Sequence, residues 1–316
     1  MSGLDAAPDL PAPTDDLVQP FQVESSGLRG RLVRLGPALD GILSRHDYPE
    51  PVSFLLGELV ALAVVLANAL KYDGVFSLQT RSGGPVTMML ADVDTAGHVR
   101  ACARFDEKAL AALTPAERGR PPLSQLVGPG YLSWTVDQGP DSEPYQGIVP
   151  LEGETLVECA DDYFRRSEQL GAGFALGIAR LTADGGSVWR AGAIMVQRIA
   201  DAGGKGAPAD NDAWDRARAL VATVRSDELA EPGLPARDLL WRLFHKDGVR
   251  VFRPVPVVAQ CRCSRARVQK VLRSFPAEEI ADMVENGEIG VTCEFCNAFY
   301  AFTEAEARTG QANPGA

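Results

Sequence analysis

Four of the six cysteines lie near the C-terminal end of the chain, in two short pairs. Cys261 and Cys263 form a C-x-C pair, Cys293 and Cys296 form a C-x-x-C pair, and 29 residues separate the two pairs. Each pair can supply two thiolates from one turn, and two such pairs are the usual ligand set of a tetrahedral zinc ion. Coordination keeps thiols deprotonated, so these sulfurs are also readily oxidised. The pattern predicts a zinc site and leaves open whether that site is structural or a switch.

The C-x-x-C pair could also belong to a thioredoxin-like redox enzyme. That chemistry needs the pair at the N-terminus of a helix that follows a strand. Cys293 and Cys296 instead lie between two segments with strand patterns, residues 289–291 and 298–302. Four unliganded buried cysteines at this spacing would be a coincidence. The arrangement therefore favours a zinc-binding hairpin over a redox enzyme.

The other two cysteines have no cysteine neighbour with which to chelate a metal. Cys159 shares a predicted helical face with Leu156, which indicates a core position. Cys102 alternates with apolar residues along a predicted strand, on the face of Arg100 and Arg104, and we expect it to be partly exposed. Both are predicted to be inert.

No pattern for enzyme catalysis is found. The three histidines are scattered, and the chain has neither a P-loop nor a G-x-S-x-G elbow. Gly171, Gly173 and Gly177 follow a predicted helix rather than a strand, so they are not a dinucleotide-binding fingerprint. We expect a protein that is not an enzyme.

Charge and composition exclude further classes. The net charge of −11 argues against binding to nucleic acid or to an anionic membrane. A basic run over 262–273 is offset by the acidic residues of 278–294. The apolar stretch 51–70 is interrupted by Glu58 and Asn68, which favours a buried core helix over a membrane span.

Residues 1–13 lack the basic and apolar regions of a secretory signal, so we expect a cytoplasmic protein. In a reducing cytosol, clustered cysteines indicate a metal or redox role rather than structural disulfides.

Strand and helix signals alternate over 14–205 and predict an α+β core domain. Strands are expected at 75–80, 84–94 and 98–105, followed by a hairpin over 173–199 that turns at 184–186. Two helices are predicted, one over about 51–71 and one that starts at Thr155, with Glu158 completing a capping box.

The rest of the chain divides into smaller segments. A Gly/Pro/Asp-rich stretch at 202–212 opens a helical linker over 206–254. A zinc module follows at 255–306, with one helix capped by Ser264 and another opened by Pro276. Residues 1–13 and 307–316 are expected to be a disordered arm and a disordered tail.

The linker contains a strongly apolar helical stripe, which consists of Leu239, Leu240, Leu243 and Phe244. Burial of each such side chain is worth about 1.5–3 kcal/mol. We therefore expect the stripe to pack on the core domain or on the zinc module.

The motifs CRCSRARV (261–268) and VTCEFCNAFYAF (291–302) resemble the zinc module of the heat-shock protein 33 family, bacterial holdase chaperones activated by oxidation. The likeness covers nearly the whole chain. It includes DDLVQPF, SLQTRSGGPV, YLSWTVDQG, YQGIVPLEG, YFRRSEQL and LLWRLFHKDGVRVF. The resemblance implies that Cys261, Cys263, Cys293 and Cys296 bind one zinc in the inactive reduced protein. It further implies that oxidation releases the metal, forms two disulfides, unfolds the linker and permits binding of unfolding clients, with dimerisation expected in that state.

The residues are consistent with such a switch. A module of roughly fifty residues is too small to be stable on its own core, so zinc binding would supply its folding free energy. Because the partner thiols are adjacent in sequence, we expect the disulfides Cys261–Cys263 and Cys293–Cys296. Two alternatives stay open at this point: a constitutive structural zinc protein that binds RNA or a protein partner, and a thiol oxidoreductase.

Overall fold

The computed structural model describes residues 15–26, 28–113, 121–139, 142–164, 171–183, 186–198 and 211–308. The chain divides into two compact units, residues 1–259 and 260–316. The predicted N-terminal arm lies outside the described residues. So do residues 184–185 of the predicted hairpin turn, most of the Gly/Pro/Asp-rich stretch at 202–212, and residues 309–316 of the predicted tail.

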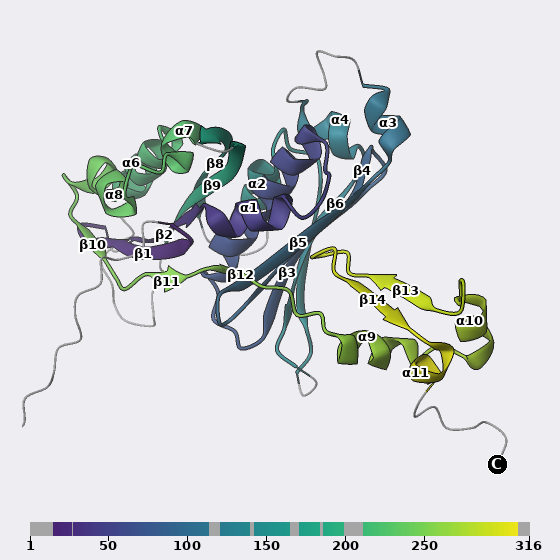
Figure 1. The fold of residues 1–316 in the computed structure, drawn as a ribbon. Helices are drawn as coiled ribbons and strands as arrows, with labels where there is room; N and C mark the ends of the chain where they lie inside the picture. The colour runs from purple at the N-terminus through teal and green to yellow at the C-terminus, as the bar shows by residue number, and fades with distance from the viewer. Residues whose placement is uncertain are drawn as a thin grey trace, which may run out of the picture. The chain divides into compact units, whose positions relative to one another are not determined.

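The first unit contains two six-stranded sheets (Figure 1). The first sheet has the order β10-β1-β2-β9-β8, and β11 also pairs with β1. Its β8 and β9 form the long hairpin predicted from the sequence, and their pairing is antiparallel throughout. The strands are β1 (Leu17–Val23), β2 (Leu28–Leu35), β8 (Ala172–Ala183), β9 (Gly186–Gln197), β10 (Val249–Val251) and β11 (Val255–Pro256).

The second sheet has the order β12-β5-β4-β3-β6-β7. The three consecutive strands predicted from the alternation and turn signals are its β3, β4 and β5, so that prediction is confirmed. Its strands are β3 (Val75–Ser82), β4 (Val86–Asp94), β5 (His98–Phe105), β6 (Gly130–Asp137), β7 (Tyr145–Pro150) and β12 (Val258–Ala259). The mixed sheets and helices confirm the α+β class.

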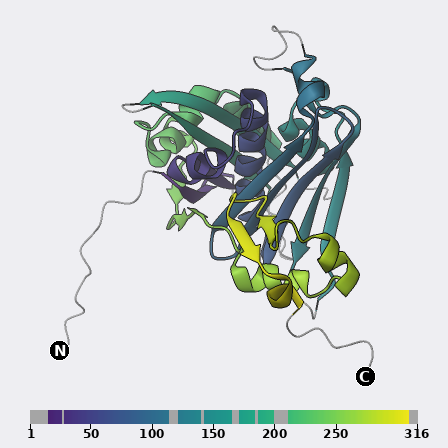
Figure 2. The same ribbon diagram turned by 45° about the vertical axis from the view of Figure 1, so that its right-hand side comes forward.

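Helices α1 (Pro37–Leu43) and α2 (Glu50–Ala67) contact strands of both sheets (Figure 1; Figure 2). Among the described residues, α2 alone is long and apolar enough to cross a membrane, and 83% of it is buried inside the unit. The core-helix interpretation is therefore confirmed. Short helices α3 (Glu107–Ala111) and α4 (Leu123–Val127) complete this part of the unit.

Helix α5 (Leu156–Tyr163) begins where the capping signal predicted. The hydroxyl of Thr155 accepts from the N–H of Glu158 at 3.1 Å. The Glu158 carboxylate accepts from the N–H of Glu154 at 2.7 Å, one residue earlier than in a standard capping box. Cys159 on this helix is 2% exposed, which confirms its predicted core position.

The expectation for Cys102 was wrong, since its side chain is only 1% exposed. It stands opposite Leu90 in the register of β4 and β5, between Arg100 and Arg104 on its own strand. A short thiol among longer side chains is covered by them, which a pattern of alternation does not reveal.

The linker helices, α6 (Asn211–Ala222), α7 (Ser226–Ala230) and α8 (Ala236–Phe244), pack on the first sheet. Strand β9 shows why this face is apolar. Its Ala193 and Met195 join the core shared with α2, whereas Ile194 and Val196 join a second core with the linker helices. The stripe Leu239, Leu240 and Phe244 is almost fully buried there, and Leu243 is partly buried.

Two glycines allow α7 to lie close to the sheet. Gly177 and Gly192 are paired in register across β8 and β9. A Cβ atom on Gly177 would lie 2.4 Å from the carbonyl oxygen of Ser226, and one on Gly192 would lie 2.4 Å from that of Leu229. Only glycine permits this approach of one main chain to another.

Two buried arginines bind the carbonyl groups at the end of α7. Arg34 on β2 donates to the carbonyl of Glu228 at 3.0 Å and also to that of Glu231. Arg190 on β9 donates to the carbonyl of Ala230 at 2.9 Å and pairs with Asp15. Guanidinium groups therefore satisfy carbonyls that a helix leaves unpaired at its C-terminus.

The second unit contains α9, α10, a two-stranded hairpin and α11 around a small core. As predicted, the Ser264 hydroxyl caps α9 by accepting from the N–H of Arg267 at 3.2 Å, and Pro276 precedes α10. The elements are α9 (Arg265–Leu272), α10 (Ala277–Asp282), β13 (Ile289–Thr292), β14 (Phe299–Phe302) and α11 (Glu304–Arg308). The buried core residues are Leu272, Ile280, Ile289, Phe302 and Ala307.

Both ends of this unit differ from the sequence-based boundaries. Residues 255–259, assigned to the module, form β11 and β12 and pair with β1 and β5 of the first unit. Ala307 and Arg308, assigned to the tail, belong to α11, and Ala307 is fully buried. Short pairing segments and a single buried alanine leave little trace in a sequence pattern.

Candidate metal centre

Two local structures present the four cysteines. Cys261 and Cys263 lie in the segment between β12 and α9, directly before the helix cap at Ser264. Cys293 and Cys296 lie in the turn of the β13–β14 hairpin. Asn297 has a φ of 58°, a left-handed conformation that closes this turn.

The four Sγ atoms all lie within 4.8 Å of one another. Two contacts each link a sulfur of the C-x-C pair to a sulfur of the C-x-x-C pair. The Sγ atoms of Cys261 and Cys293 are 3.7 Å apart, and those of Cys263 and Cys296 are 3.3 Å apart. Tetrahedral coordination with Zn–S bonds of about 2.3 Å would place the sulfurs about 3.8 Å apart. The folded module therefore holds four thiols at the spacing that such an ion requires.

Each sulfur also accepts a hydrogen bond. Cys261 Sγ accepts from the N–H of Cys263 at 3.5 Å. Main-chain N–H groups of the hairpin turn donate to Cys293 and Cys296. The Sγ of Cys263 lies 3.1 Å from the phenol oxygen of Tyr300 on β14. Donors of this kind stabilise thiolates.

The protonation of each thiol in this cluster depends on its neighbours. Burial opposes ionisation of Cys263, but hydrogen bonds from Tyr300 and the other three thiols lower its pKa to about 7. Burial, followed by hydrogen bonding with Cys263, raises the pKa of Cys296 to about 12. Burial also raises the pKa of Cys293. The thiols therefore share negative charge unevenly, and a bound cation would favour ionisation of all four.

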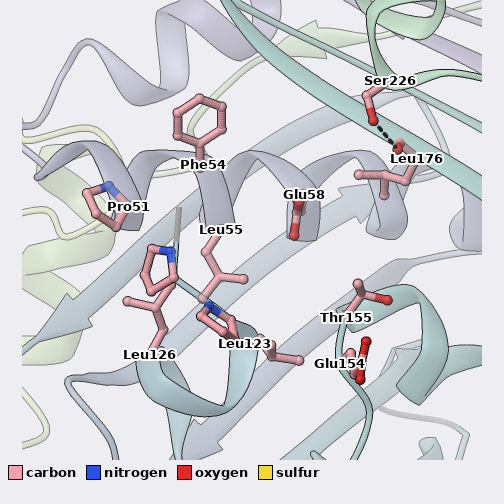
Figure 3. A pocket seen from close by; sticks show the side chains of 12 residues that line it. Pro51, Phe54, Leu55, Glu58, Leu123, Leu126, Glu154, Thr155, Leu176 and Ser226 are labelled. Atoms are coloured by element: carbon pink, nitrogen blue, oxygen red, sulfur yellow. Dashed lines mark hydrogen bonds between the residues drawn. The ribbon is translucent and has the colours of Figure 1, made fainter. Parts of the chain in front are cut away.

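The first unit has a cavity of about 370 Å³ between α2, α4 and β8 (Figure 3). Leu55 and Leu126 contribute apolar wall, and Glu58 contributes a carboxylate. Ser226, the first residue of α7, also lines it and donates its hydroxyl to the carbonyl of Leu176 at 3.4 Å. None of the described residues that line this cavity is a cysteine.

Comparison with known proteins gives the family. The family model described as Hsp33 protein matches residues 16–303, which is most of the chain. The chain belongs to the Hsp33 family. Hsp33 proteins are chaperones and not enzymes, so membership makes this chain a chaperone that binds unfolded proteins.

Curated Hsp33 relatives match over nearly their full length. A 33 kDa chaperonin of Caulobacter vibrioides (strain NA1000 / CB15N) is 46% identical over 297 residues, which cover 94% of this chain and 97% of the relative. A 33 kDa chaperonin of Pseudomonas fluorescens (strain SBW25) is 36% identical over 296 residues and covers 93% of each chain.

A solved Hsp33 structure has the same fold. The crystal structure of the 33 kDa chaperonin of Thermotoga maritima, a heat shock protein 33 homolog, matches with a TM-score of 0.76 at 22% identity. The match covers 92% of this chain and 96% of that one.

Sequence reasoning anticipated the four clustered cysteines but missed three side chains near the functional elements of this Hsp33 chain. Tyr300 was expected only as an alternating strand residue, and its contact with Cys263 depends on hairpin register. Only Arg190 carried a usable signal, because it is the one charged residue in β9, whereas β2 contains Arg29 and Arg31 besides Arg34. Buried charge of this kind needs specific partners.

Proposed function

We propose that this protein is a cytoplasmic holdase activated by oxidation. In its reduced form Cys261, Cys263, Cys293 and Cys296 bind one zinc, and the chaperone surface is covered. The main support for this proposal is the cluster of four sulfurs, which lie within 4.8 Å of one another in a unit whose buried core consists of five residues. The family membership supports the chaperone part of the proposal.

Zinc fits this donor set. Four thiolates are a closed structural set, with no position left for a substrate. When bound, zinc supplies folding free energy to the module, on the order of 10–16 kcal/mol in small zinc-finger peptides. The module has a core of only five buried apolar residues, so without the free energy of zinc binding it would have little stability.

Peroxide supplies the oxidant for release of the metal. One thiolate attacks the O–O bond of hydrogen peroxide, which gives a sulfenic acid and hydroxide, and a second thiolate displaces hydroxide from that sulfur to form the disulfide. When each disulfide forms, its two thiolates together transfer two electrons to one molecule of hydrogen peroxide. In total, four zinc-bound thiolates and two peroxides give two disulfides, four hydroxide ions and a free zinc ion.

The predicted pairing, Cys261–Cys263 and Cys293–Cys296, differs from the sulfur contacts of the folded module. In the folded unit the recorded sulfur contacts at 3.3 and 3.7 Å join opposite pairs. Once the module unfolds, the thiols adjacent in sequence have the highest effective concentration. Local disulfides would then oppose a return to the four-thiol geometry.

Unfolding would pass to the linker along the chain. One residue, Gln260, separates β12 from Cys261, and β12 pairs with β5 only through Val258 and Ala259. Release of the segment 249–259 would leave α8 supported mainly by its apolar contacts, with one ion pair from Arg242 to Glu228 of α7. The stripe Leu239, Leu240, Leu243 and Phe244 would then be able to leave the first sheet.

The surface exposed by linker release suits unfolding clients. It has apolar side chains on both the sheet and the helices, among them Phe21, Leu32, Ile194, Leu240 and Phe244. A contiguous apolar patch binds the exposed apolar segments of unfolding proteins. The same patch provides a route to homodimerisation of the oxidised protein.

One titration tests the proposal. Hydrogen peroxide is added stepwise to the reduced, zinc-loaded protein, while a metallochromic dye reports free zinc and light scattering reports aggregation of a thermally unfolding client. We expect zinc release and suppression of aggregation to rise together, and Cys159→Ser to behave as wild type. Zinc that survives peroxide would instead indicate a constitutive structural zinc protein.

A further inference from the structure

The four sulfurs differ in the source of their hydrogen bonds. Main-chain N–H groups donate to Cys261, Cys293 and Cys296. The main chain supplies these donors whatever the neighbouring side chains are. Cys263 receives its bond from the hydroxyl of Tyr300, with 3.1 Å between oxygen and sulfur. A single substitution can therefore remove the donor of one sulfur without changing the ligand set.

Tyr300 is held in place by the hairpin. It pairs with Val291 in the register of β13 and β14, and both side chains pack against the core of the module. Its neighbour Phe299 points away and is 67% exposed. The strand thus fixes the direction of the phenol, and Ser264 fixes the segment of Cys263 by capping α9.

We propose that Tyr300 is a positioning residue of the metal centre, which orients Cys263 as a ligand and shields it from oxidant. This inference rests on the zinc site proposed above. A hydrogen bond to a coordinating thiolate withdraws charge from the sulfur and lowers its nucleophilicity. Removal of a group that hydrogen-bonds to a metal ligand typically weakens metal affinity by about 10- to 100-fold.

The asymmetry sets the order of oxidation. The hydroxyl of Tyr300 lies 3.1 Å from the Cys263 sulfur, whereas the main-chain donor of Cys261 lies 3.5 Å from its sulfur. Because Cys263 has the closer donor of these two, peroxide attacks Cys261 before Cys263. Loss of the hydroxyl makes Cys263 a more reactive target and weakens its hold on the ion. Tyr300 therefore raises the amount of oxidant needed to release the zinc and activate the chaperone.

The test compares Tyr300→Phe with wild type, using Tyr131→Phe as a matched control. Tyr131 is a partly exposed tyrosine in the first unit, so this control removes a hydroxyl far along the chain from the cysteines. Chelator competition measures zinc affinity, and the charge-transfer bands of the Co²⁺-substituted protein report the thiolate ligands. A sulfenic-acid trap followed by peptide mapping identifies the sulfur that is oxidised first.

We expect Tyr300→Phe to bind zinc about 10-fold more weakly, with shifted Co²⁺–thiolate bands and earlier trapping at Cys263. Tyr131→Phe should match wild type in all three measurements. Unchanged affinity, bands and trapping order would overturn the inference. Trapping at Cys263 first in the wild-type protein would also overturn it, and this measurement does not depend on folding of the variant. A wild-type Co²⁺ spectrum without four thiolates would reject the proposed zinc site instead.

Discussion

Gly177 of β8 and Gly192 of β9 are paired in register, and the main chain of α7 lies directly against both. The sheet offers no side chain at this point, so contact is made between main chains. Arg34 and Arg190 then hold the carbonyl groups at the end of the same helix. The linker is thus fixed by close approach and hydrogen bonds at α7 and by apolar burial at α8.

Gly177→Ala should loosen the linker. The new methyl group would lie 2.4–2.9 Å from main-chain atoms of Ser226, which cannot move aside as a flexible side chain would. Overpacking of this kind costs about 1–3 kcal/mol. Hydrogen exchange over residues 226–231 should accelerate, and the reduced zinc-loaded variant should suppress client aggregation in part. Gly41→Ala, whose methyl group would meet nothing within 4 Å, should leave both measurements unchanged.

Arg34→Met should destabilise the same helix for a different reason. The substitution keeps an apolar stem but leaves the carbonyls of Glu228 and Glu231 without their donor. A buried acceptor that loses its partner costs about 1–3 kcal/mol. Thermal unfolding and hydrogen exchange of α7 measure the loss. Arg29→Met, on an exposed position of the same strand, is the control, and equal effects of the two variants would contradict a role for the buried contact.

Much of this architecture follows from local patterns. The hairpins, the capped helices α5 and α9, and the paired cysteines each depend on residues close in sequence, so their types and spacing predict them. The relationships that attach α7 to the sheet depend on strand register. Gly177 meets Gly192 only because β8 and β9 pair as they do, and no sequence pattern sets that register here.

The same limit applies to the metal centre. The spacing of the four cysteines predicts a shared site, but the phenol of Tyr300 reaches Cys263 only through the β13–β14 register and the position of α9. The covered position of Cys102 likewise depends on the length of the side chains around it, which a period-two pattern does not encode.

Zinc affinity should fall as the pH falls. Burial raises the pKa values of Cys293 and Cys296, so zinc binding has to displace protons from these thiols. Each displaced proton changes the apparent affinity by about 10-fold per pH unit, which corresponds to about 1.36 kcal/mol. Chelator competition between pH 6 and pH 8 measures this slope. An affinity that does not vary with pH in this range would mean that the thiols are already ionised without metal.

Leu240→Asp should separate linker release from oxidation. Leu240 is fully buried between α8 and the first sheet, so an ionised carboxylate there would cost several kcal/mol and would oppose docking of the helix. We expect the reduced, zinc-loaded variant to suppress aggregation of a thermally unfolding client. Trp241→Asp introduces the same charge at the next position, where the side chain is 63% exposed, and should stay inactive.

Hydrogen exchange decides between the two ways in which Leu240→Asp could fail. If α8 exchanges freely while the reduced variant remains as inactive as wild type, linker release is not what activates the chaperone. If α8 stays protected, the carboxylate has been accommodated, and Phe244→Asp then repeats the test at the residue that stacks on Phe21 with ring centroids 5.6 Å apart. Zinc content is measured in each variant, because activity that follows metal loss would reflect the module rather than the linker.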